Sequence, residues 1–227
     1  MSKNAAAVVV AFGVVVNASP VVANAMVGLP VIGSITKVVT FGKYTNEQNN
    51  MMADVNIPKV EGDVTANAEI ETYAKDLIAK YETELEKTNG EGNYAMQSDY
   101  EVVADGKDYV SIRINTVITQ ASGAQYVKIF TIDKATGETV TLQKYVNDNT
   151  KLQAISDNIK QQMEAQMKED ENKSYFIGED GFNGLTGNES FYLNEAGELV
   201  IAFGEYEVAP GSMGTVQFTI ADNVWKS

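Results

Sequence analysis

The 227-residue sequence contains no cysteine and no histidine. Without cysteine there are no disulfide bonds, no thiolate metal ligands and no cysteine nucleophile. Without imidazole there is no Ser-His-Asp triad and no HExxH zinc site. Any catalysis would depend on carboxylates, lysines or hydroxyl groups, and no such group is singled out. We therefore predict a protein that is not an enzyme, with no catalytic residue, no metal site and no cofactor.

Positive charge is also scarce. The chain has 17 Lys and Arg residues against 31 Asp and Glu residues, a formal net charge of −14, and Arg113 is its single arginine. Phosphate backbones would be repelled, which excludes nucleic acid as a partner. An anionic surface favours a cationic partner, or serves solubility alone. Residues 1–50 carry a net charge of +2, so the remaining residues carry −16. This asymmetry suggests two environments along one chain.

The N-terminus has the three-part pattern of an export signal. Lys3 precedes an apolar run at residues 5–16, and small side chains follow at Ala23 and Ala25. We predict that residues 1–25 are a signal peptide or a truncated membrane anchor, with Ala23 and Ala25 as the signal-peptidase motif. The run is shorter than the ~20 residues of a membrane span, and a buried helix of a soluble domain is the alternative. A signal peptide and a truncated anchor both predict that the rest of the chain is exported, either secreted or held at the extracellular face of the membrane.

The rest of the chain shows two helical patterns among several strand patterns. Residues 26–60 are expected to form a membrane-proximal connector that is polar and exposed at residues 46–50. Apolar spacing predicts helices over residues 66–87 and 150–171, and Asn67 is the expected N-cap of the first. Alternating patterns predict strands at residues 100–103, 110–119, 126–133, 140–142, 190–194, 199–208 and 215–220.

Strands in hairpin-like groups with two separate helices predict an α+β fold. We expect one domain over residues 61–222, a mostly antiparallel β-sheet with two amphipathic helices packed on it. Two short motifs resemble catalytic boxes, since residues 34–37 match S-x-x-K and residues 156–158 match S-D-N. No K-T-G box accompanies them, so coincidence is the better explanation. Residues 180–184 resemble a calcium loop weakly, and a glycine-rich turn is favoured there.

Several segments resemble one known family. Residues 131–142 (TIDKATGETVTL) resemble the "FDLKTGK…TL" hairpin of the extracellular domain of RsiV-type anti-sigma factors. Residues 191–220 resemble that family's closing strands, whose usual form is "YEIAPYAxG…FTI". Residues 17–41 resemble its membrane-adjacent segment. Residues 55–120 resemble the companion domain shared with the peptidoglycan deacetylase PdaC.

The resemblance implies a sensing role in signal transduction across a Gram-positive cell envelope. RsiV proteins cross the membrane once, hold a sigma factor inactive in the cytoplasm and bind lysozyme, a cationic protein, outside. Signal peptidase then cleaves near the membrane. By their position, Ala23 and Ala25 would form that cleavage motif in this chain. A sigma factor would be a partner only if a cytoplasmic segment is missing from this chain.

The closing strands supply the candidate partner-binding residues, which are Glu205, Tyr206, Glu207, Ala209 and Pro210. The expected ligand is a cationic protein such as lysozyme, or a cell-wall component. The family's "APY" stands here as Ala209-Pro210-Gly211, and its "GAHG" turn as residues 123–126 (GAQY). Two alternatives are a peptidoglycan-binding accessory domain, as in PdaC-type deacetylases, and a structural envelope protein without a specific ligand.

Overall fold

The computed structural model describes the backbone of residues 9–15 and the whole of residues 37–62, 64–178 and 181–226. The chain divides into two compact units, each made of separate segments. The first unit comprises Met1–Val102, Ile114–Ala124 and Lys134–Glu138, and the second comprises Val103–Arg113, Gln125–Asp133 and Thr139–Ser227. Strands β4, β5 and β6 contribute residues to both units.

A six-stranded sheet has its strands in sequence order, from β1 to β6. Strand β2 pairs antiparallel with both β1 and β3, whereas β3 and β4 are parallel. The strands are β1 (Val9–Val15), β2 (Val38–Gln48), β3 (Met51–Val60), β4 (Tyr94–Asp105), β5 (Tyr109–Thr119) and β6 (Gly123–Asp133). Helix α1 (Ala66–Lys87) connects the two parallel strands, because a parallel pair needs a crossover connection.

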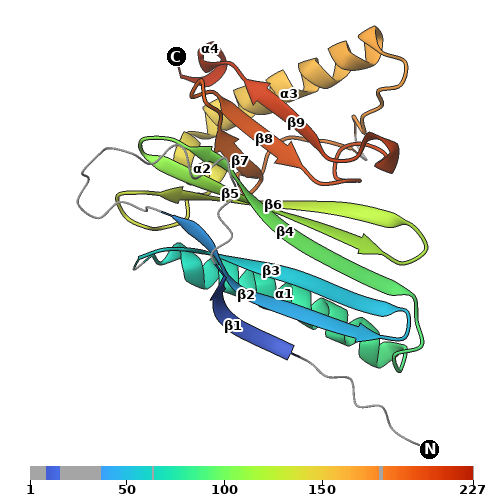
Figure 1. Cartoon of the computed structure of the whole chain (residues 1–227). Coiled ribbons are helices and arrows are strands. Elements are labelled where there is room, and N and C mark those ends of the chain that lie inside the picture. Colours follow the sequence, from blue (N-terminus) through green and yellow to red (C-terminus); the bar gives the residue numbers. More distant parts are fainter. Residues whose placement is uncertain (1–8, 16–36, 63, 179–180, 227) are drawn as a thin grey trace, which may run out of the picture. The chain divides into compact units, whose positions relative to one another are not determined.

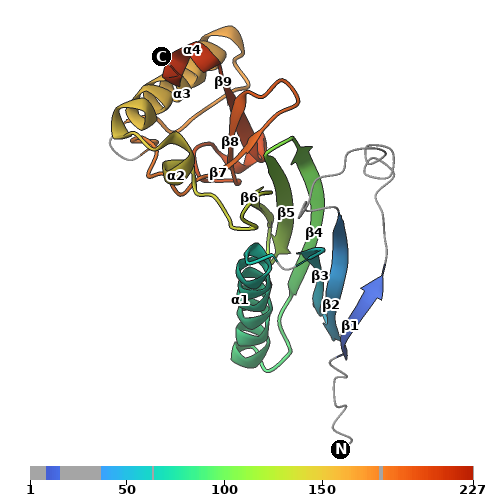
Figure 2. The same cartoon turned by 90° about the vertical axis from the view of Figure 1, so that its left-hand side faces the viewer.

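Helix α1 covers one face of the strands in the first unit (Figures 1 and 2). Its bounds are those that the apolar spacing predicted, and Ile70, Ala74 and Tyr81 on that stripe are buried. The buried residues packed together there are Tyr44, Met51, Ala53, Val55, Ile57, Ala74, Tyr81, Tyr94, Met96 and Ile118. The prediction of a first amphipathic helix packed on the sheet is therefore confirmed.

Two predicted asparagine roles in this unit are wrong. The residue before α1 is Thr65, and Asn67 instead pairs its side-chain amide with the backbone N–H and carbonyl of Val60 at 2.8 and 2.9 Å. Asn46 was expected to be exposed, but it is buried and accepts a hydrogen bond from the Tyr81 hydroxyl at 2.9 Å. Both amides satisfy buried polar groups, a task that a sequence pattern does not reveal.

The second unit contains an antiparallel three-stranded sheet, in the order β7-β8-β9, with helix α3 packed against it (Figure 1). Its elements are α2 (Leu142–Val146), α3 (Asn149–Glu169), β7 (Ser190–Leu193), β8 (Leu199–Phe203), the 3₁₀ helix η1 (Gly211–Met213), β9 (Val216–Ile220) and α4 (Asp222–Trp225). The apolar stripe of α3 and the inner faces of β8 and β9 form one core. Together the two sheets and the helices confirm the α+β fold class.

Three segments differ from their predicted conformation. The expected connector at residues 26–60 contains strands β2 and β3, because its alternate apolar residues face α1. The return strand expected at residues 140–142 is reduced to an isolated antiparallel bridge between Thr139 and Ile132. Helix α2 begins at Leu142, and Thr141 caps it by accepting from the Lys144 N–H. The strand expected at residues 199–208 ends at Phe203, since a turn begins at Gly204.

The N-terminal segment is described only in part. Val9–Val15, inside the predicted signal or anchor, forms strand β1, which suits the high β-propensity of valine. Ala23 and Ala25 lie outside the described residues, so the cleavage motif stays a prediction. Among the described helices, none combines the length and the hydropathy that crossing a membrane requires.

Candidate functional site

The loop between β8 and β9, residues 204–215, holds all five residues predicted to bind a partner. It lies within the second unit. Tyr206 and Glu207 are exposed, whereas Glu205 and Pro210 are half-buried. Ala209 is only 2% exposed and packs in the core of the unit. The side chains available to a partner are therefore those of residues 205–207, with part of Pro210.

Glu205 fixes the start of the loop against strand β6. Its backbone N–H donates to the Gln125 carbonyl at 2.8 Å, and its carboxylate Oε2 accepts from the Gln125 N–H, also at 2.8 Å. Strand β6 is the last strand of its sheet, so these groups of Gln125 have no neighbouring strand to pair with. One residue thus supplies both hydrogen bonds that a further strand would make.

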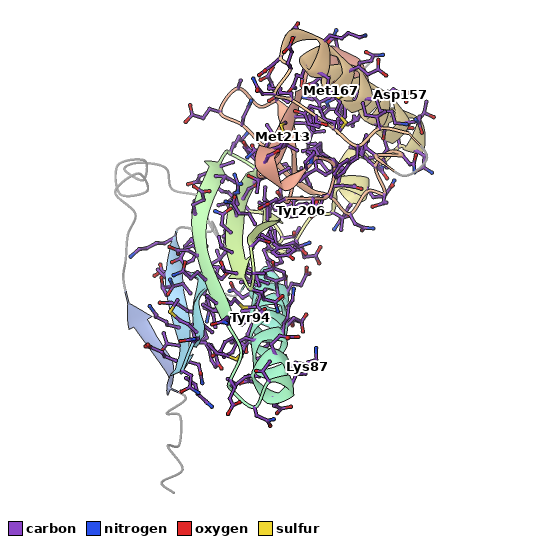
Figure 3. All side chains as sticks on the ribbon, turned by 90° about the vertical axis from the view of Figure 1, so that its right-hand side faces the viewer. Lys87, Tyr94, Asp157, Met167, Tyr206 and Met213 are labelled. Atoms are coloured by element: carbon purple, nitrogen blue, oxygen red, sulfur yellow. The ribbon has the colours of Figure 1, made fainter. Side chains whose placement is uncertain are left out.

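Tyr206 is the most exposed large hydrophobic side chain in the described part of the protein, at 54%. Its φ of 68° lies in the left-handed region, which costs a residue other than glycine roughly 1–2 kcal/mol. A Cβ placed on Gly211 would overlap the Tyr206 ring and hydroxyl and the Glu205 carboxylate. The tyrosine ring therefore lies directly over the Gly211 backbone. Figure 3 labels Tyr206 together with Met213, the last residue of η1.

The far side of the loop is held by the core. Val208 and Ala209 are buried, and the Val208 carbonyl accepts from the Phe176 N–H at 2.8 Å. The 3₁₀ helix η1 follows Pro210 and ends at Gly214, whose φ of 61° and ψ of −146° suit glycine. Because both ends are fixed, the Tyr206 side chain is presented on a rigid support.

Two further exposed aromatic residues border this loop, and the sequence analysis did not propose them. Tyr126 follows Gln125, the partner of Glu205, and Phe176 donates to Val208. The exposed large hydrophobic side chains among the described residues are Met52, Tyr126, Phe176 and Tyr206. Three of these four therefore border one loop. The sequence signal was an aromatic residue beside a glycine turn, and this signal is too common to be selective.

The other motifs noted in the sequence have structural explanations. Ser156 is buried in α3, where its hydroxyl donates to the Leu152 carbonyl and accepts from the Leu185 N–H. It therefore connects the helix to the glycine-rich segment. Ser34 and Asp180 lie outside the described residues. Within the described ranges, no group of three or more carboxylates is placed to hold a metal ion.

Two comparisons of the sequence with known proteins gave overlapping matches. Residues 145–222 match the family model described as "Protein of unknown function (DUF3298)". The anti-sigma-V factor RsiV of Bacillus subtilis (strain 168) is 39% identical over 230 residues, which cover 97% of this chain and 80% of that protein. Both matches include the β8–β9 loop.

Two solved structures of the DUF3298 family are also similar. One, from Bacteroides fragilis, has a TM-score of 0.49 and 16% identity, and covers 81% of this chain and 90% of that chain. The other, from Pseudomonas aeruginosa PAO1, has a TM-score of 0.46 and 12% identity, and covers 79% and 86% of the two chains.

Proposed function

Because this chain belongs to the RsiV family of anti-sigma factors, we propose that it is an exported sensing protein that binds a cationic protein such as lysozyme through the β8–β9 loop. It acts by docking rather than by turnover. The observation that carries the proposal is the exposure of Tyr206 on a loop held at both ends. Tyrosine is among the residues that most often dominate the binding energy of protein interfaces.

The surroundings of Tyr206 suit an interface with a protein. Tyr126 and Phe176, at 40% and 39% exposure, add exposed apolar area at positions that border the same loop. Exposed apolar groups gathered at one place are typical of docking surfaces, whereas single exposed residues are not. The left-handed backbone of Tyr206 supports the same interpretation, since unfavourable conformations are retained most often at functional sites.

Charge favours a cationic partner. Glu205 and Glu207 flank Tyr206 in a chain with a net charge of −14. Complementary charge speeds the encounter of two proteins and selects among partners more than it adds affinity. We therefore assign the affinity mainly to the aromatic side chains and the association rate mainly to the carboxylates.

Titration calorimetry of the full chain with hen lysozyme tests this proposal. Tyr206→Ala should weaken binding by ~30-fold, about 2 kcal/mol, because it removes the central aromatic contact. Glu207→Gln should weaken binding only a few-fold, mainly through a slower association rate. Higher salt should weaken the wild-type complex by screening the charges.

Two control variants separate this loop from general surface effects. Met52→Ala removes an exposed hydrophobic side chain of the first unit, and Glu164→Gln removes an exposed charge from α3. Both should bind lysozyme as the wild type does. If no class of lysozyme produced binding heat, lysozyme would be refuted as the partner. Equal losses in Met52→Ala and Tyr206→Ala would refute the loop as the binding site.

Residues 1–25 are proposed to direct export, with cleavage by signal peptidase after Ala25. The enzyme requires small side chains at both motif positions. Expression in a Gram-positive host should therefore yield a product that begins at Met26, and Ala23→Phe should leave the chain uncut. N-terminal sequencing of the extracellular material measures this, with Ala18→Phe as the control. Cleavage that persists in Ala23→Phe would refute the motif. A sigma factor is proposed as a partner only if a cytoplasmic segment is missing from this chain.

A further inference from the structure

A groove in the second unit lies apart from the β8–β9 loop and is unused by the function proposed above. It has a volume of about 590 Å³, within the range of small-molecule binding sites. The turn between β4 and β5, residues 104–109, forms one wall. The turn between β7 and β8, residues 193–197, forms another, and Tyr145 and Lys226 complete the lining. None of the five candidate partner-binding residues lines it.

Two tyrosine rings contribute to the apolar part of this groove, together with Leu193. Tyr109 and Tyr145 meet edge to face, with ring centroids 5.7 Å apart. Tyr145 also packs on Phe191 at 5.4 Å and on Trp225 at 5.5 Å, so its ring is held on several sides. Burial raises the pKa of both hydroxyls, which therefore stay neutral at pH 7 and can donate or accept hydrogen bonds.

The polar part of the groove mixes both signs of charge. Its carboxylates belong to Asp105, Asp108 and Glu195, and its ammonium groups to Lys107 and Lys226. Lys226 is held in place by Asp222 at 2.7 Å and by the Trp225 ring. A groove lined by carboxylates alone would favour a cationic ligand, and a groove lined by ammonium groups alone would favour an anionic ligand. Mixed donors and acceptors beside aromatic rings suit a neutral ligand that carries many hydroxyl groups.

The two turns that form the walls are rigid. The Asn194 side chain accepts from the N–H groups of Ala196 and Glu198, and its amide donates to the Glu198 carboxylate. In the other turn, the Gly106 N–H donates to the Tyr109 carbonyl at 2.9 Å. A groove with fixed walls loses less conformational entropy when a ligand binds.

We propose that this groove binds a neutral saccharide, whose C–H faces pack on the Tyr109 and Tyr145 rings and whose hydroxyl groups bond to the carboxylates and ammonium groups of the two turns. The geometry of the groove carries this proposal, not the family relationship. Because the loop and the groove share no lining residue, loss of lysozyme binding would leave the proposal standing.

The single tryptophan of the chain provides the readout. Trp225 packs on Tyr145, so a sugar stacked on Tyr145 should change its fluorescence. Tri-N-acetylchitotriose is the probe, with spermidine as the cationic and inorganic phosphate as the anionic comparison. We expect a saturable change with the trisaccharide below about 10 mM, and none with the two ions. Saturation-transfer NMR on the same samples measures contact independently of fluorescence.

The double variant Asp108→Ala/Glu195→Ala should weaken trisaccharide binding at least tenfold, since both side chains are exposed and contribute acceptors. Glu164→Ala/Lys168→Ala, two exposed residues of α3 outside the groove lining, should bind as the wild type does. Three results would each overturn the proposal: no saturation up to about 10 mM, equal affinity in the double variant, or saturation by spermidine or phosphate but not by the sugar.

Discussion

Tyr206 adopts a backbone conformation that tyrosine rarely takes, and its neighbours explain how it is retained. Glu205 fixes the preceding residue to Gln125, and Gly211 leaves room for the ring to lie on the backbone.

Gly211→Ala tests this arrangement. The backbone at Gly211 does not require glycine, so the free energy of unfolding should change by less than about 1 kcal/mol. The added methyl group should displace the Tyr206 ring and weaken lysozyme binding by ~10-fold. Thermal melting and calorimetry measure the two effects. Gly106→Ala, where the nearest atom to a new Cβ is 3.6 Å away, serves as the control. Unchanged affinity in Gly211→Ala would show that the ring position is irrelevant.

At the scale of elements, sequence patterns predicted helices better than strand ends. Helix α1 was predicted with its observed bounds and α3 within two residues at each end, because their apolar stripes continue over five turns or more. The loop that ends β8 was missed because Glu205 is fixed by Gln125, a residue 80 positions away. Of the candidate site, the family resemblance proposed Tyr206, whereas nothing in the sequence proposed Phe176, whose exposure is a tertiary property.

Helix α3 provides a prediction about pH. Asp148 is its N-cap and accepts from the N–H groups of Lys151 and Thr150, which lower the pKa of the carboxyl. A lowered folded-state pKa stabilises the protein above pH ~4, and this contribution is lost as pH falls through the folded value. Asp148→Ala should therefore lower the melting temperature at pH 7, and its difference from the wild type should shrink at pH 2–3.

Asp148→Asn separates the cap from its charge. Asparagine caps helices about as well as aspartate, so this variant should melt close to the wild type at pH 7. Its melting temperature should also vary less than that of the wild type as the carboxylates are protonated. Melting curves followed by circular dichroism at several pH values measure all three proteins. An Asp148→Ala difference that is the same at pH 2.5 and pH 7 would contradict the assigned role.

At the scale of the whole molecule, charge is the dominant property. The residues beyond position 50 carry a net charge of −16, against +2 for residues 1–50. The ion pairs Lys75–Glu71 and Lys87–Glu84 are at the surface, where each contributes little. Like charges repel one another in the compact state. The amino-acid composition alone predicted this net negative charge. It did not predict the two compact units, because each collects segments that are distant in the sequence.

Salt should therefore stabilise this protein. Raising NaCl from about 10 to 300 mM at pH 7 shortens the screening length and should raise the melting temperature by a few degrees, since about 1 kcal/mol corresponds to roughly 2–4 °C at this size. Near pH 4.4, the isoelectric point of the sequence, the same addition should have a much smaller effect. Differential scanning calorimetry measures both. A melting temperature that falls with salt at pH 7 would contradict this account.

The carboxylate of Glu205 also guards a sheet edge. Unpaired strand edges invite chains to join one another into aggregates, and β6 is the last strand of its sheet. Glu205 occupies both outward backbone groups of Gln125 and places a negative charge beside them. The residue that positions the aromatic side chain thus also keeps copies of the protein apart. For the exported sensor proposed above, this protection would allow exposed aromatic rings without edge-to-edge pairing of neighbouring copies.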